Sequence, residues 1–574
     1  MNCLVRLINV FMNDKFFEPY HIIWHITNAC NATCKYCFTT SYFSKKELKS
    51  RFWKLIVRRI NEEKSVQRVS IIGGEPLLVK ELPQIIKQLR KDLKINIDSN
   101  LLRIKEKWND SFKKVCFSTT LDSLNDKINK KTRGYSAKTT LNNIKFLLAK
   151  GVEVQVIIVA TKYNVSTLEK TVKYLLNNGV KRVGIGKVRM IGRAFNLGYS
   201  YFYDNSTTQK IINVIKSLVK EYGEEKIIAY NWYDKELFDL GIEYEPSCGC
   251  ALFKACIDWN GFMYPCELMP FYWKIFENYY NIPLPHLKNR KIREIFANSK
   301  LFKFFREKML YYPVGCESCE HKNVCDHGCR FHAFLISTNL LSRDPTCSKD
   351  VKSVYDVIGY SYYSPFSLIG KKRLSGKIGK FFKSLCDKLG YKIYDLGCGG
   401  GIWTFFFEDM KKKVIGIDND RTMILIANEY KKLHNKNSKF VFSDIRRYNY
   451  KKADSAVLLD NTITYFSKDD FLKLLLKLKK SVNLFIVEIG KREIKEGKFN
   501  YKFDSFEICE KIRKINHETY EREFLNKQTG LSIKIYTYYW NIQKLRDVLK
   551  KFGKILFEKE IENSHFIIFK FSKN

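Results

Sequence analysis

The sequence lacks any long hydrophobic run: no stretch of 18 consecutive apolar residues occurs in the 574 residues. A membrane-spanning helix needs about 20 such residues, so we expect no membrane span and no membrane partner. The first 17 residues are apolar, but Arg6, Asn9, Asn13 and Asp14 interrupt them, which is not typical of a secretory signal peptide. We therefore expect a cytoplasmic protein.

Acidic residues are scarce relative to basic ones. The chain has 60 Asp and Glu against 101 Lys and Arg, a formal charge of +41, of which residues 352–574 contribute +19 and the first 351 residues +22. Such a field favours acidic partners such as RNA or an acidic peptide. No discrete RNA-binding module and no internal repeat is recognisable, so nucleic acid is the less favoured partner. The lysine-rich stretch 371–380 is expected to form a solvated amphipathic helix edge.

Cysteine, by contrast, is abundant and clustered. Three of the 17 cysteines, Cys30, Cys34 and Cys37, lie in NACNATCKYCF, and nine lie between residues 248 and 347. A short loop with this spacing can bind three irons of an iron-sulfur cube and leaves the fourth iron open to a small molecule, which indicates redox chemistry. The alternatives are a zinc knuckle that borrows a distant fourth ligand, or buried thiols without a ligand.

Six strand-like runs, most of them separated by helical stretches, precede residue 190. The first runs into the cysteine loop and the second ends in Gly73, Gly74, Glu75 and Pro76. Functional loops at the carboxyl ends of strands are typical of a β/α barrel, so we predict an α/β fold with a partial (β/α)6 barrel over residues 1–240. The runs are residues 19–30, 68–72, 94–99, 115–120, 152–160 and 183–188.

These motifs resemble the radical S-adenosylmethionine (SAM) superfamily, whose CxxxCxΦC signature has an aromatic residue, here Tyr36, before the last cysteine. The resemblance implies that Cys30, Cys34 and Cys37 bind a [4Fe-4S] cluster and that SAM chelates the open iron. Electron transfer from the cluster would then cleave SAM to a 5′-deoxyadenosyl radical, which abstracts a hydrogen atom.

Two further segments fit the same resemblance. Gly73, Gly74, Glu75 and Pro76 match the GGEP segment, where backbone groups and the glutamate would meet the SAM ammonium. In TLDSLNDKINKKTRG, Asp122, Arg133 and Gly134 take the places of the fourth-strand region, and Thr120 replaces a serine. Arg133 either pairs with the SAM carboxylate or is an exposed surface arginine. Asn100 lacks the glycine that follows it in relatives, which leaves its role open.

The second cysteine group resembles the SPASM domain, CX9-15GX4C followed by CX2CX5CX3C and a final cysteine, and we assign it to residues 241–350. The resemblance implies two auxiliary [4Fe-4S] clusters, with one of nine cysteines spare. Cys316, Cys319, Cys325 and Cys347 would hold one cluster. Cys266 and Cys329 would join two of Cys248, Cys250 and Cys256 on the other. Zinc ribbons or a disulfide framework are the alternatives.

Glu267 directly follows Cys266. In relatives that modify peptides, an acidic residue at this place can serve as a base during oxidation of the substrate radical. We therefore select Glu267 as the catalytic candidate, and the alternative is a surface carboxylate in a turn.

The third section, residues 352–574, carries a different pattern. KIYDLGCGGG (392–401), VIGIDND (414–420) and KFVFSDI (439–445) predict a Rossmann-like, doubly wound domain with a glycine-rich turn. Together they resemble class I SAM-dependent methyltransferases. The resemblance implies that Asp395, with Gly397 and Gly399, contacts the methionine portion, Asp418 the ribose and Asp444 the adenine.

The rest of residues 352–574 contains the residues expected to contact the methyl acceptor. Asp460, Asn461 and Tyr465, in 453–466, are the substrate-side candidates, and the tail from KIYTYYW to HFIIFKF resembles a closing hairpin. Methyl transfer from a sulfonium depends mainly on proximity and alignment, so the acceptor leaves little trace in the sequence. A domain that binds SAM without catalysis is the alternative.

The sequence thus predicts a radical SAM enzyme that oxidises, cross-links or otherwise modifies a peptide or small precursor, coupled to methyl transfer. An electron donor such as ferredoxin or flavodoxin is the expected partner, and an RNA-modifying enzyme is the alternative. About twenty residues precede the first barrel strand, too few for a separate peptide-recognition domain. A peptide substrate is therefore expected to use a short leader or a separate recognition protein.

Overall fold

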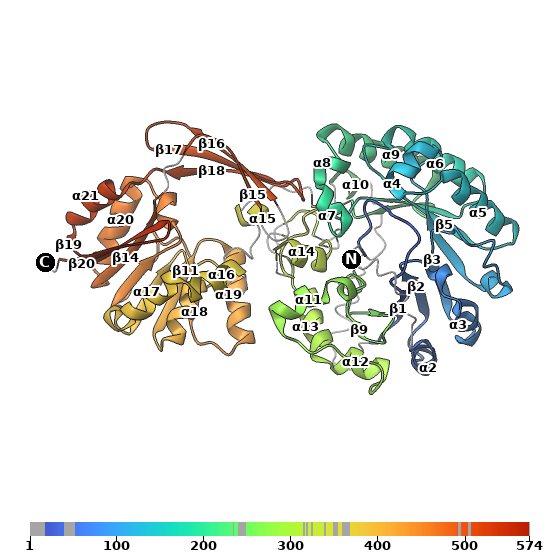
Figure 1. Cartoon of the computed structure of the whole chain (residues 1–574), viewed down its shortest axis with the longest axis horizontal. Helices are drawn as coiled ribbons and strands as arrows, with labels where there is room; N and C mark the ends of the chain where they lie inside the picture. The colour runs from blue at the N-terminus through green and yellow to red at the C-terminus, as the bar shows by residue number, and fades with distance from the viewer. Residues whose placement is uncertain are drawn as a thin grey trace. The chain divides into compact units, whose positions relative to one another are not determined.

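The computed structural model divides the chain into two compact units, which are described separately (Figure 1). Unit 1 comprises residues 1–336, 340–349 and 528–530, and unit 2 comprises the remainder. None of the described helices is long and apolar enough to cross a membrane. The amino-terminal segment 1–17, discussed above as a signal peptide, lies outside the described residues. These are 18–39, 52–232, 235–238, 248–313, 316, 319–322, 325, 327–337, 340–347, 354–358, 368–491, 495–502 and 507–572.

Unit 1 is built on seven adjacent parallel strands in sequential order (Figure 1). All six predicted strands are confirmed, and a seventh extends the sheet. All residues of the first strand are buried, as expected for a strand inside a parallel sheet of an α/β fold. The strands are β1 (His21–Thr27), β2 (Arg68–Gly73), β3 (Lys94–Asp98), β4 (Cys116–Thr120), β5 (Val154–Val159), β6 (Arg182–Gly186) and β7 (Ile227–Tyr230).

Helices connect these strands and bury one apolar stripe each against the sheet. In α6, for example, Leu168, Val172 and Leu175 recur at helical spacing and are buried. The helices and turns are α2 (Trp53–Glu62), η1 (Pro76–Leu78), α3 (Leu82–Gln88), η2 (Asp110–Lys114), α4 (Asp126–Arg133), α5 (Ala137–Ala149), α6 (Val165–Asn177), α7 (Arg193–Leu197), α8 (Tyr199–Phe202), α9 (Asn205–Tyr222) and α10 (Lys235–Phe238).

The cysteine-rich segment continues the same sheet. Strand β8 (Lys254–Ile257) pairs in parallel with β1, and β9 (Met263–Tyr264) pairs antiparallel with β8. The sheet is therefore continuous across the predicted boundary near residue 240. Aromatic side chains such as Phe276, Phe331 and Phe334 fill the core beside it. The helices here are α11 (Met269–Tyr280), α12 (Ile292–Asn298), α13 (Lys300–Leu310) and α14 (Arg330–Ser337).

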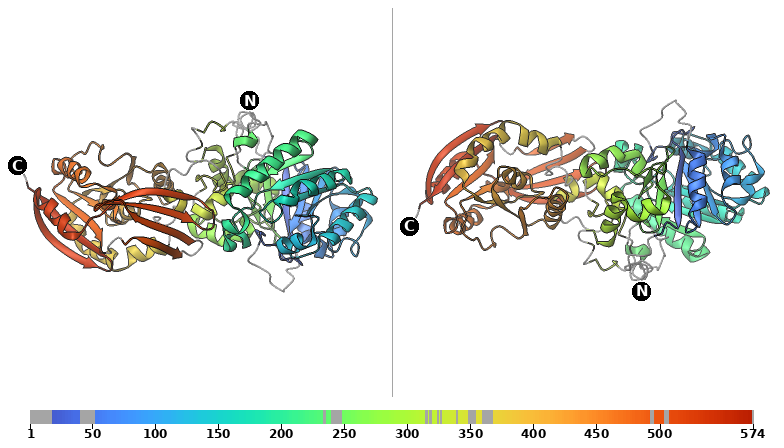
Figure 2. Two further views of the ribbon diagram at one scale, coloured as in Figure 1. Left: turned by 90° about the horizontal axis from the view of Figure 1, so that it is seen from above. Right: turned by 90° about the horizontal axis from the view of Figure 1, so that it is seen from below.

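Unit 2 contains a seven-stranded sheet in the order β12-β11-β10-β13-β14-β20-β19, which confirms the doubly wound arrangement (Figures 1 and 2). Five strands are parallel and the last two form an antiparallel hairpin. The order reverses between β10 and β13, where open α/β sheets bind ligands. The strands are β10 (Lys392–Leu396), β11 (Lys413–Asp418), β12 (Lys439–Phe442), β13 (Ser455–Leu458), β14 (Leu484–Gly490), β19 (Gly553–Ile561) and β20 (Ser564–Phe571).

The expectation of an amphipathic helix edge at residues 371–380 holds for α17, where Lys377 and Lys380 are exposed and Ile378 and Phe382 are buried. The stretch is broken at Gly376 into α16 and α17. An added Cβ at Gly379 would lie 1.7 Å from the Leu374 carbonyl oxygen, so the two helices meet backbone to backbone. The helices and turns are α15 (Val354–Ile358), α16 (Leu368–Ser375), α17 (Lys377–Leu385), η4 (Cys386–Leu389), α18 (Ile402–Asp409), α19 (Arg421–Leu433), η5 (Thr462–Tyr465), α20 (Lys468–Lys479) and α21 (Ile542–Lys550).

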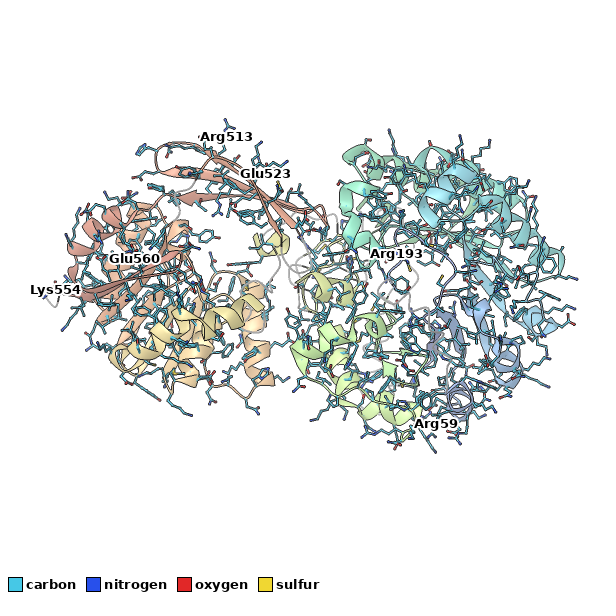
Figure 3. All side chains as sticks on the ribbon, in the orientation of Figure 1. Arg59, Arg193, Arg513, Glu523, Lys554 and Glu560 are labelled. Atoms are coloured by element: carbon cyan, nitrogen blue, oxygen red, sulfur yellow. The ribbon has the colours of Figure 1, made fainter. Side chains whose placement is uncertain are left out.

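The predicted closing hairpin is formed by β19 and β20, and a separate four-stranded antiparallel sheet takes up its first segment. KIYTYYW falls largely in β18 (Ser532–Tyr538), which pairs with β17 (Thr519–Asn526) and not with the tail. The alternating exposure along β18 suits a half-covered sheet, whereas β20 is almost wholly buried. The other strands are β15 (Gly497–Lys502) and β16 (Glu507–Lys514). Figure 3 shows Arg513 and Glu523 on this sheet and Glu560 on the hairpin.

Candidate functional sites

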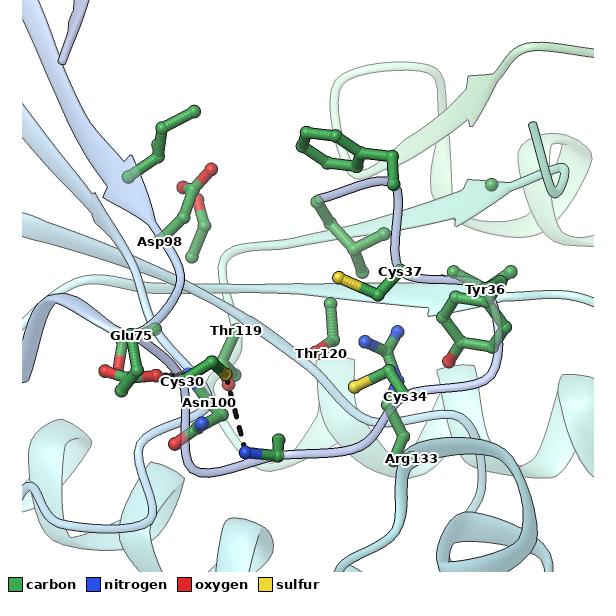
Figure 4. Close-up of a pocket in the computed structure, with 18 of the residues that line it drawn as sticks. Cys30, Cys34, Tyr36, Cys37, Glu75, Asp98, Asn100, Thr119, Thr120 and Arg133 are labelled. Carbon is green, nitrogen blue, oxygen red and sulfur yellow. Dashed lines mark hydrogen bonds between the residues drawn. The ribbon is translucent and has the colours of Figure 1, made fainter. Parts of the chain in front are cut away.

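The first site is a cavity of about 410 Å³ at the carboxyl ends of the parallel strands of unit 1 (Figure 4). Cys30, Cys34 and Cys37 line it together with the Gly73–Glu75 segment, so the structure brings the two predicted motifs together. Its size is within the range of small-molecule pockets. The other walls come from the ends of β3 to β7 and include Asp98, Asn100, Thr119, Thr120, Arg133, Val159, Arg189 and Asn231.

Gly73 and Gly74 bring the second strand's end against the cysteine loop. The Gly74 N–H donates to the Thr27 carbonyl and the Glu75 N–H to the Ala29 carbonyl, both at 2.8 Å. A Cβ on Gly74 would lie 2.0 Å from the Ala29 oxygen, and Gly73 has φ +141°. The two glycines therefore allow close contact between two loops of the protein. The contact of this segment with SAM stays a prediction.

Glu75 is buried, with 1% of its surface exposed, and both carboxylate oxygens accept hydrogen bonds. Oε1 accepts from Ser99 Oγ at 2.6 Å and Leu77 N at 3.0 Å, and Oε2 from Asn100 N at 2.7 Å. Burial raises its pKa to about 7 despite these donors. A carboxylate in this state gains from a cationic ligand, which fits the predicted SAM ammonium. Buried Pro76 begins the η1 turn behind it.

Arg133 is buried, which removes the alternative of an exposed surface arginine. Its Nε and Nη2 each donate to the Asp122 carboxylate at 3.2 Å, and the guanidinium carbon lies 4.6 Å from the centroid of the Tyr36 ring. The Tyr36 hydroxyl also donates to Asp122. Asp122 thus neutralises Arg133 and fixes the aromatic residue of the cysteine loop.

Three further residues named in the sequence analysis lie beside this group. Gly134 ends α4 with φ +81°, and an added Cβ would meet Thr33 Oγ1 at 2.2 Å, so it lies against the cysteine loop. The Asn100 amide donates to Asn31 Oδ1 at 2.7 Å, which also ties β3 to that loop. Thr120 Oγ1 lies 3.4 Å from the Tyr135 hydroxyl and lines the cavity.

The thiols of the cysteine loop are suited to be ligands of iron. Burial raises the pKa of Cys30 to about 12 and raises that of Cys34. Thiolates in such surroundings need a nearby metal charge to form. Three thiols on one wall of a cavity with room beside them fit a cluster with one open iron. Arg193 fixes the loop further, because its Nη1 donates to the Cys34 carbonyl at 3.0 Å (Figure 3).

The second site gathers four of the SPASM cysteines. Ligand atoms of Cys250, Cys266 and Glu267 lie within 4.8 Å of one another. Burial raises the pKa of Cys266 to about 12, and its neighbours include Cys250, Cys329 and Cys248. Four thiols gathered in one buried place fit an iron-sulfur cluster.

Cys256 lies apart from this group. It is buried in β8 opposite Ile23 of β1. Burial raises the pKa of Cys256 well above its ordinary value, and the charged neighbours that act on it are Glu267 and Asp258. The structure therefore points to Cys256 as the spare member of the trio that the sequence left open.

Three of the remaining four predicted ligands, Cys316, Cys319 and Cys347, form a third group, and Cys325 belongs to the same segment. Burial raises the pKa of Cys316 to about 12, and Cys347 and Cys319 act on the same thiol. The Cys319 N–H donates to the Cys316 carbonyl at 3.1 Å, and Cys325 Sγ accepts from His327 N at 3.3 Å. No disulfide joins any cysteine of the described residues, so a disulfide framework finds no support there.

Glu267 lies between the second cysteine group and the first cavity. Its Oε2 is 3.9 Å from Cys266 Sγ and 4.0 Å from Cys250 Sγ, and its Oε1 is 3.9 Å from Arg189 Nη1. His25 Nε2 donates to the Glu267 carbonyl at 2.9 Å. The sequence reading missed Arg189, although it closely follows β6 and a search of strand ends would have found it.

The third site is the glycine turn after β10 in unit 2. Gly397 and Gly399 have φ of +70° and +51°, and the Gly399 N–H donates to Asp418 Oδ2 at 2.8 Å. Burial raises the pKa of Asp418 to about 6 and that of Asp395 to about 7. Asp395 accepts from Thr404 Oγ1 at 2.6 Å, whereas the more exposed Asp444 pairs with Arg446 at 2.6 Å.

The predicted acceptor side lies at the end of β13. Asp460 and Asn461 have positive φ, and Tyr465 in η5 is 46% exposed. Asp460 contacts Arg373 Nη2 at 2.5 Å and accepts from Trp403 Nε1 at 3.1 Å. Its N–H donates to Glu488 at 2.8 Å.

Glu488 and Arg373 were missed by the sequence reading. Glu488 is 1% exposed and also accepts from Arg373 Nη2 at 2.8 Å and Ser564 Oγ at 2.5 Å. A single acid inside the apolar run FIVEIG is the signal that could have identified Glu488. Arg373 lies in a lysine-rich stretch and carries no comparable signal.

Comparison with known families confirms the three resemblances in the predicted order. Residues 24–175 match the radical SAM superfamily, residues 248–320 the SPASM iron-sulfur cluster-binding domain, and residues 393–483 a methyltransferase domain. The first two families imply [4Fe-4S] clusters and SAM as cofactors.

Individual relatives match parts of the chain. A cysteine-type anaerobic sulfatase-maturating enzyme from Clostridium novyi (strain NT) is 24% identical over 326 residues, covering 52% of this chain and 85% of the relative. SuiB from Streptococcus suis bound to SAM is 17% identical, covers 60% of this chain and 81% of that structure, and has a TM-score of 0.47. A SAM-dependent methyltransferase from Clostridium acetobutylicum is 17% identical, covers 36% and 98%, and has a TM-score of 0.32.

Proposed function

We propose that this chain, whose segments match radical SAM, SPASM and methyltransferase families in that order, modifies a peptide or small precursor by radical chemistry and transfers a methyl group in the same pathway. The observation that carries the proposal is the cavity in which Cys30, Cys34, Cys37 and the Gly73–Glu75 segment meet. A cluster with SAM bound there would supply a 5′-deoxyadenosyl radical for hydrogen abstraction.

The residues of the cavity have distinct tasks in this proposal. The three thiols hold the cluster, and buried Glu75 accepts from the SAM ammonium, which favours the ionised carboxylate. Arg133 presents hydrogen-bond donors at the cavity wall and is kept in place by Asp122. Val159 and Ile157 give the wall an apolar part, which limits water near the reacting atoms.

Glu267 is proposed as the base that accepts a proton from the substrate radical, and a cluster held by the adjacent Cys250 and Cys266 would accept the electron. Its Oε1 lies 3.9 Å from Nη1 of Arg189, a residue of the cavity wall, which supports a role near this cavity. Its 27% side-chain exposure leaves it accessible to a substrate. A Glu267→Gln protein should cleave SAM but form little oxidised product. Normal product formation would remove Glu267 from this role.

A peptide is favoured as the substrate because the Clostridium novyi relative is named for maturation of sulfatases, which are proteins. We also propose an electron donor such as ferredoxin or flavodoxin and a cytoplasmic location, because iron-sulfur chemistry needs reducing surroundings. A strongly basic chain also suits an acidic peptide.

The two auxiliary clusters are assigned to separate cysteine sets. Cys248, Cys250, Cys266 and Cys329 are proposed to hold one cluster, and Cys316, Cys319, Cys325 and Cys347 the other. Cys256→Ala should then retain about twelve irons per chain, whereas Cys250→Ala should lose about four. Equal iron loss in both variants would contradict the assignment.

Unit 2 is proposed to transfer the methyl group from a second SAM molecule. The Gly397–Gly399 turn and Asp418 would hold SAM, and the Asp460 region would align the acceptor with the methyl group. A non-catalytic SAM-binding domain would bind SAM equally well but would release no S-adenosylhomocysteine.

The experiment is anaerobic reconstitution with iron and sulfide, followed by electron paramagnetic resonance of the reduced protein with and without SAM. A SAM-dependent change in the spectrum, together with release of 5′-deoxyadenosine, supports the proposed radical site. A Cys34→Ala protein should show neither. Well-folded wild-type protein with few irons and an unchanged spectrum would reject the radical function.

A further inference from the structure

Arg330 is a buried cation placed directly beside a proposed cluster ligand. It follows Cys329, begins α14 and is 3% exposed. Its Nη2 donates to the Tyr311 carbonyl at 2.5 Å. Within the described part of the chain, its Nε and Nη1 have no hydrogen-bond partner. A buried guanidinium with two unsatisfied nitrogens is costly unless an anion lies nearby.

The groups that surround Arg330 belong to both auxiliary cysteine sets. Cys248 and Cys329 come from one set, and Cys316 and Cys325 from the other. A guanidinium is always protonated in proteins, so a fixed positive charge lies among thiols of both sets.

We propose that Arg330 is a positioning residue shared by the two auxiliary clusters, and that its charge raises the reduction potential of both. This inference rests on the proposed function, because it requires clusters at both cysteine sets. A cluster held by four thiolates gains one negative charge when it takes up one electron. A fixed positive charge nearby stabilises the reduced form more than the oxidised form.

Arg343 offers a matched comparison. It acts on Cys316 of the third group, as Arg330 does, but it is half-buried. Arg330 acts on thiols of both sets. Loss of the Arg343 charge should therefore affect one cluster, and loss of the Arg330 charge should affect two.

The test is a potentiometric titration of the full chain followed by electron paramagnetic resonance. A background with Cys30, Cys34 and Cys37 changed to alanine leaves the two auxiliary clusters for observation. Arg330→Gln should lower the reduced-to-oxidised ratio of both clusters about tenfold at a fixed potential, which is 59 mV for one electron. Arg330→Lys should recover most of this loss, and Arg343→Gln should change only one cluster.

Iron content separates the failure modes. About eight irons in the background protein support the two proposed clusters, and about four would reject the proposed ligand sets rather than Arg330. Full iron with unchanged potentials in Arg330→Gln, or a change in one cluster alone, overturns the shared role. If Arg330→Gln loses its iron, Arg330→Met takes its place as the neutral variant of similar length, and unchanged potentials of the two clusters in Arg330→Met overturn the proposal.

Discussion

The cavity of unit 1 and the glycine turn of unit 2 are two solutions for the same proposed ligand. In each, a glycine with positive φ lies at the end of a parallel strand or just after it, and a buried acid accepts a backbone N–H: Asn100 N to Glu75 and Gly399 N to Asp418. In unit 1, Gly73 and Gly74 bring a loop with three thiols to the same edge. In unit 2, the edge carries the Asp460 cluster instead.

The difference between the two regions therefore lies in what is placed beside the sulfonium. Thiols that hold an iron-sulfur cluster would allow electron transfer from the cluster to SAM. An acceptor aligned with the methyl group would allow nucleophilic displacement of that group from the sulfonium. Unit 2 also has a thiol in its turn, Cys398, but this side chain is buried and burial raises its pKa well above the ordinary value. A single buried thiol does not provide a cluster site.

The sharpest way to break this comparison is to exchange the two loop thiols for alanine. Cys34→Ala should abolish 5′-deoxyadenosine formation, a larger loss than the roughly 10- to 100-fold caused by removing an outer-shell partner of a metal. Cys398→Ala is the matched control and should retain normal iron content and deoxyadenosine formation. Iron analysis and product quantification measure both, and equal loss in the two variants would contradict the account.

The arginines of the two regions should differ in their contribution to stability. Arg133→Gln leaves buried Asp122 without its cation and should cost about 3–5 kcal/mol of unfolding free energy. Arg446→Gln removes a half-exposed pair with Asp444 and should cost less than about 1 kcal/mol. Denaturant unfolding of the metal-free chains measures both. A small effect at Arg133 would show that the Asp122 pair is not important for the cavity.

Glu75 should make the stability of the metal-free protein depend on pH. Its pKa rises from 4.5 to about 7 on folding, so the folded state binds more protons between these values. Stability should therefore fall as pH rises from about 4.5 to 7, by at most about 3 kcal/mol, and the penalty should stay constant above pH 7. Glu75→Gln should remove this component. An identical pH profile in the variant would contradict the burial argument.

The smallest expected effect concerns SAM affinity in unit 2. Asp418→Asn keeps an oxygen acceptor but loses the charge, so SAM affinity at this site should fall about tenfold, or roughly 1.4 kcal/mol. Calorimetry in the Cys30, Cys34, Cys37 alanine background isolates this site. In the protein that keeps all three loop cysteines, Asp418→Asn should leave 5′-deoxyadenosine formation unchanged. A loss of 5′-deoxyadenosine formation in this variant would contradict the independence of the two sites.

Much of the fold follows from local patterns in the sequence. The strands that precede the functional loops are apolar runs that end in glycine or cysteine, and they are recovered with small shifts in their ends. Strand β7 was missed because it has only four residues, IIAY. The pairing of β8 with β1 joins residues more than 230 positions apart, and such long-range pairing leaves no local signal.

The site residues follow the same division. Cysteine spacing identified the three thiol groups, but which thiols lie together depended on the buried position of Cys256 in β8. Arg133 could be exposed or buried until Asp122 was found beside it. Glu488 and Arg373 act through partners distant in sequence, so their environment becomes visible only in three dimensions.

The most direct test of two separate SAM sites is one anaerobic reaction with SAM carrying a deuterated methyl group, in which 5′-deoxyadenosine and S-adenosylhomocysteine are quantified together. Candidate peptides are added as substrates for the radical site, and candidate methyl acceptors are added for unit 2. The account predicts both products from the wild-type chain. When modified acceptor replaces unmodified acceptor, Cys34→Ala should lose deoxyadenosine alone. Under the same condition and at limiting SAM, Asp418→Asn should lose S-adenosylhomocysteine alone. Loss of both products in either variant would contradict the claim that the two regions use SAM independently.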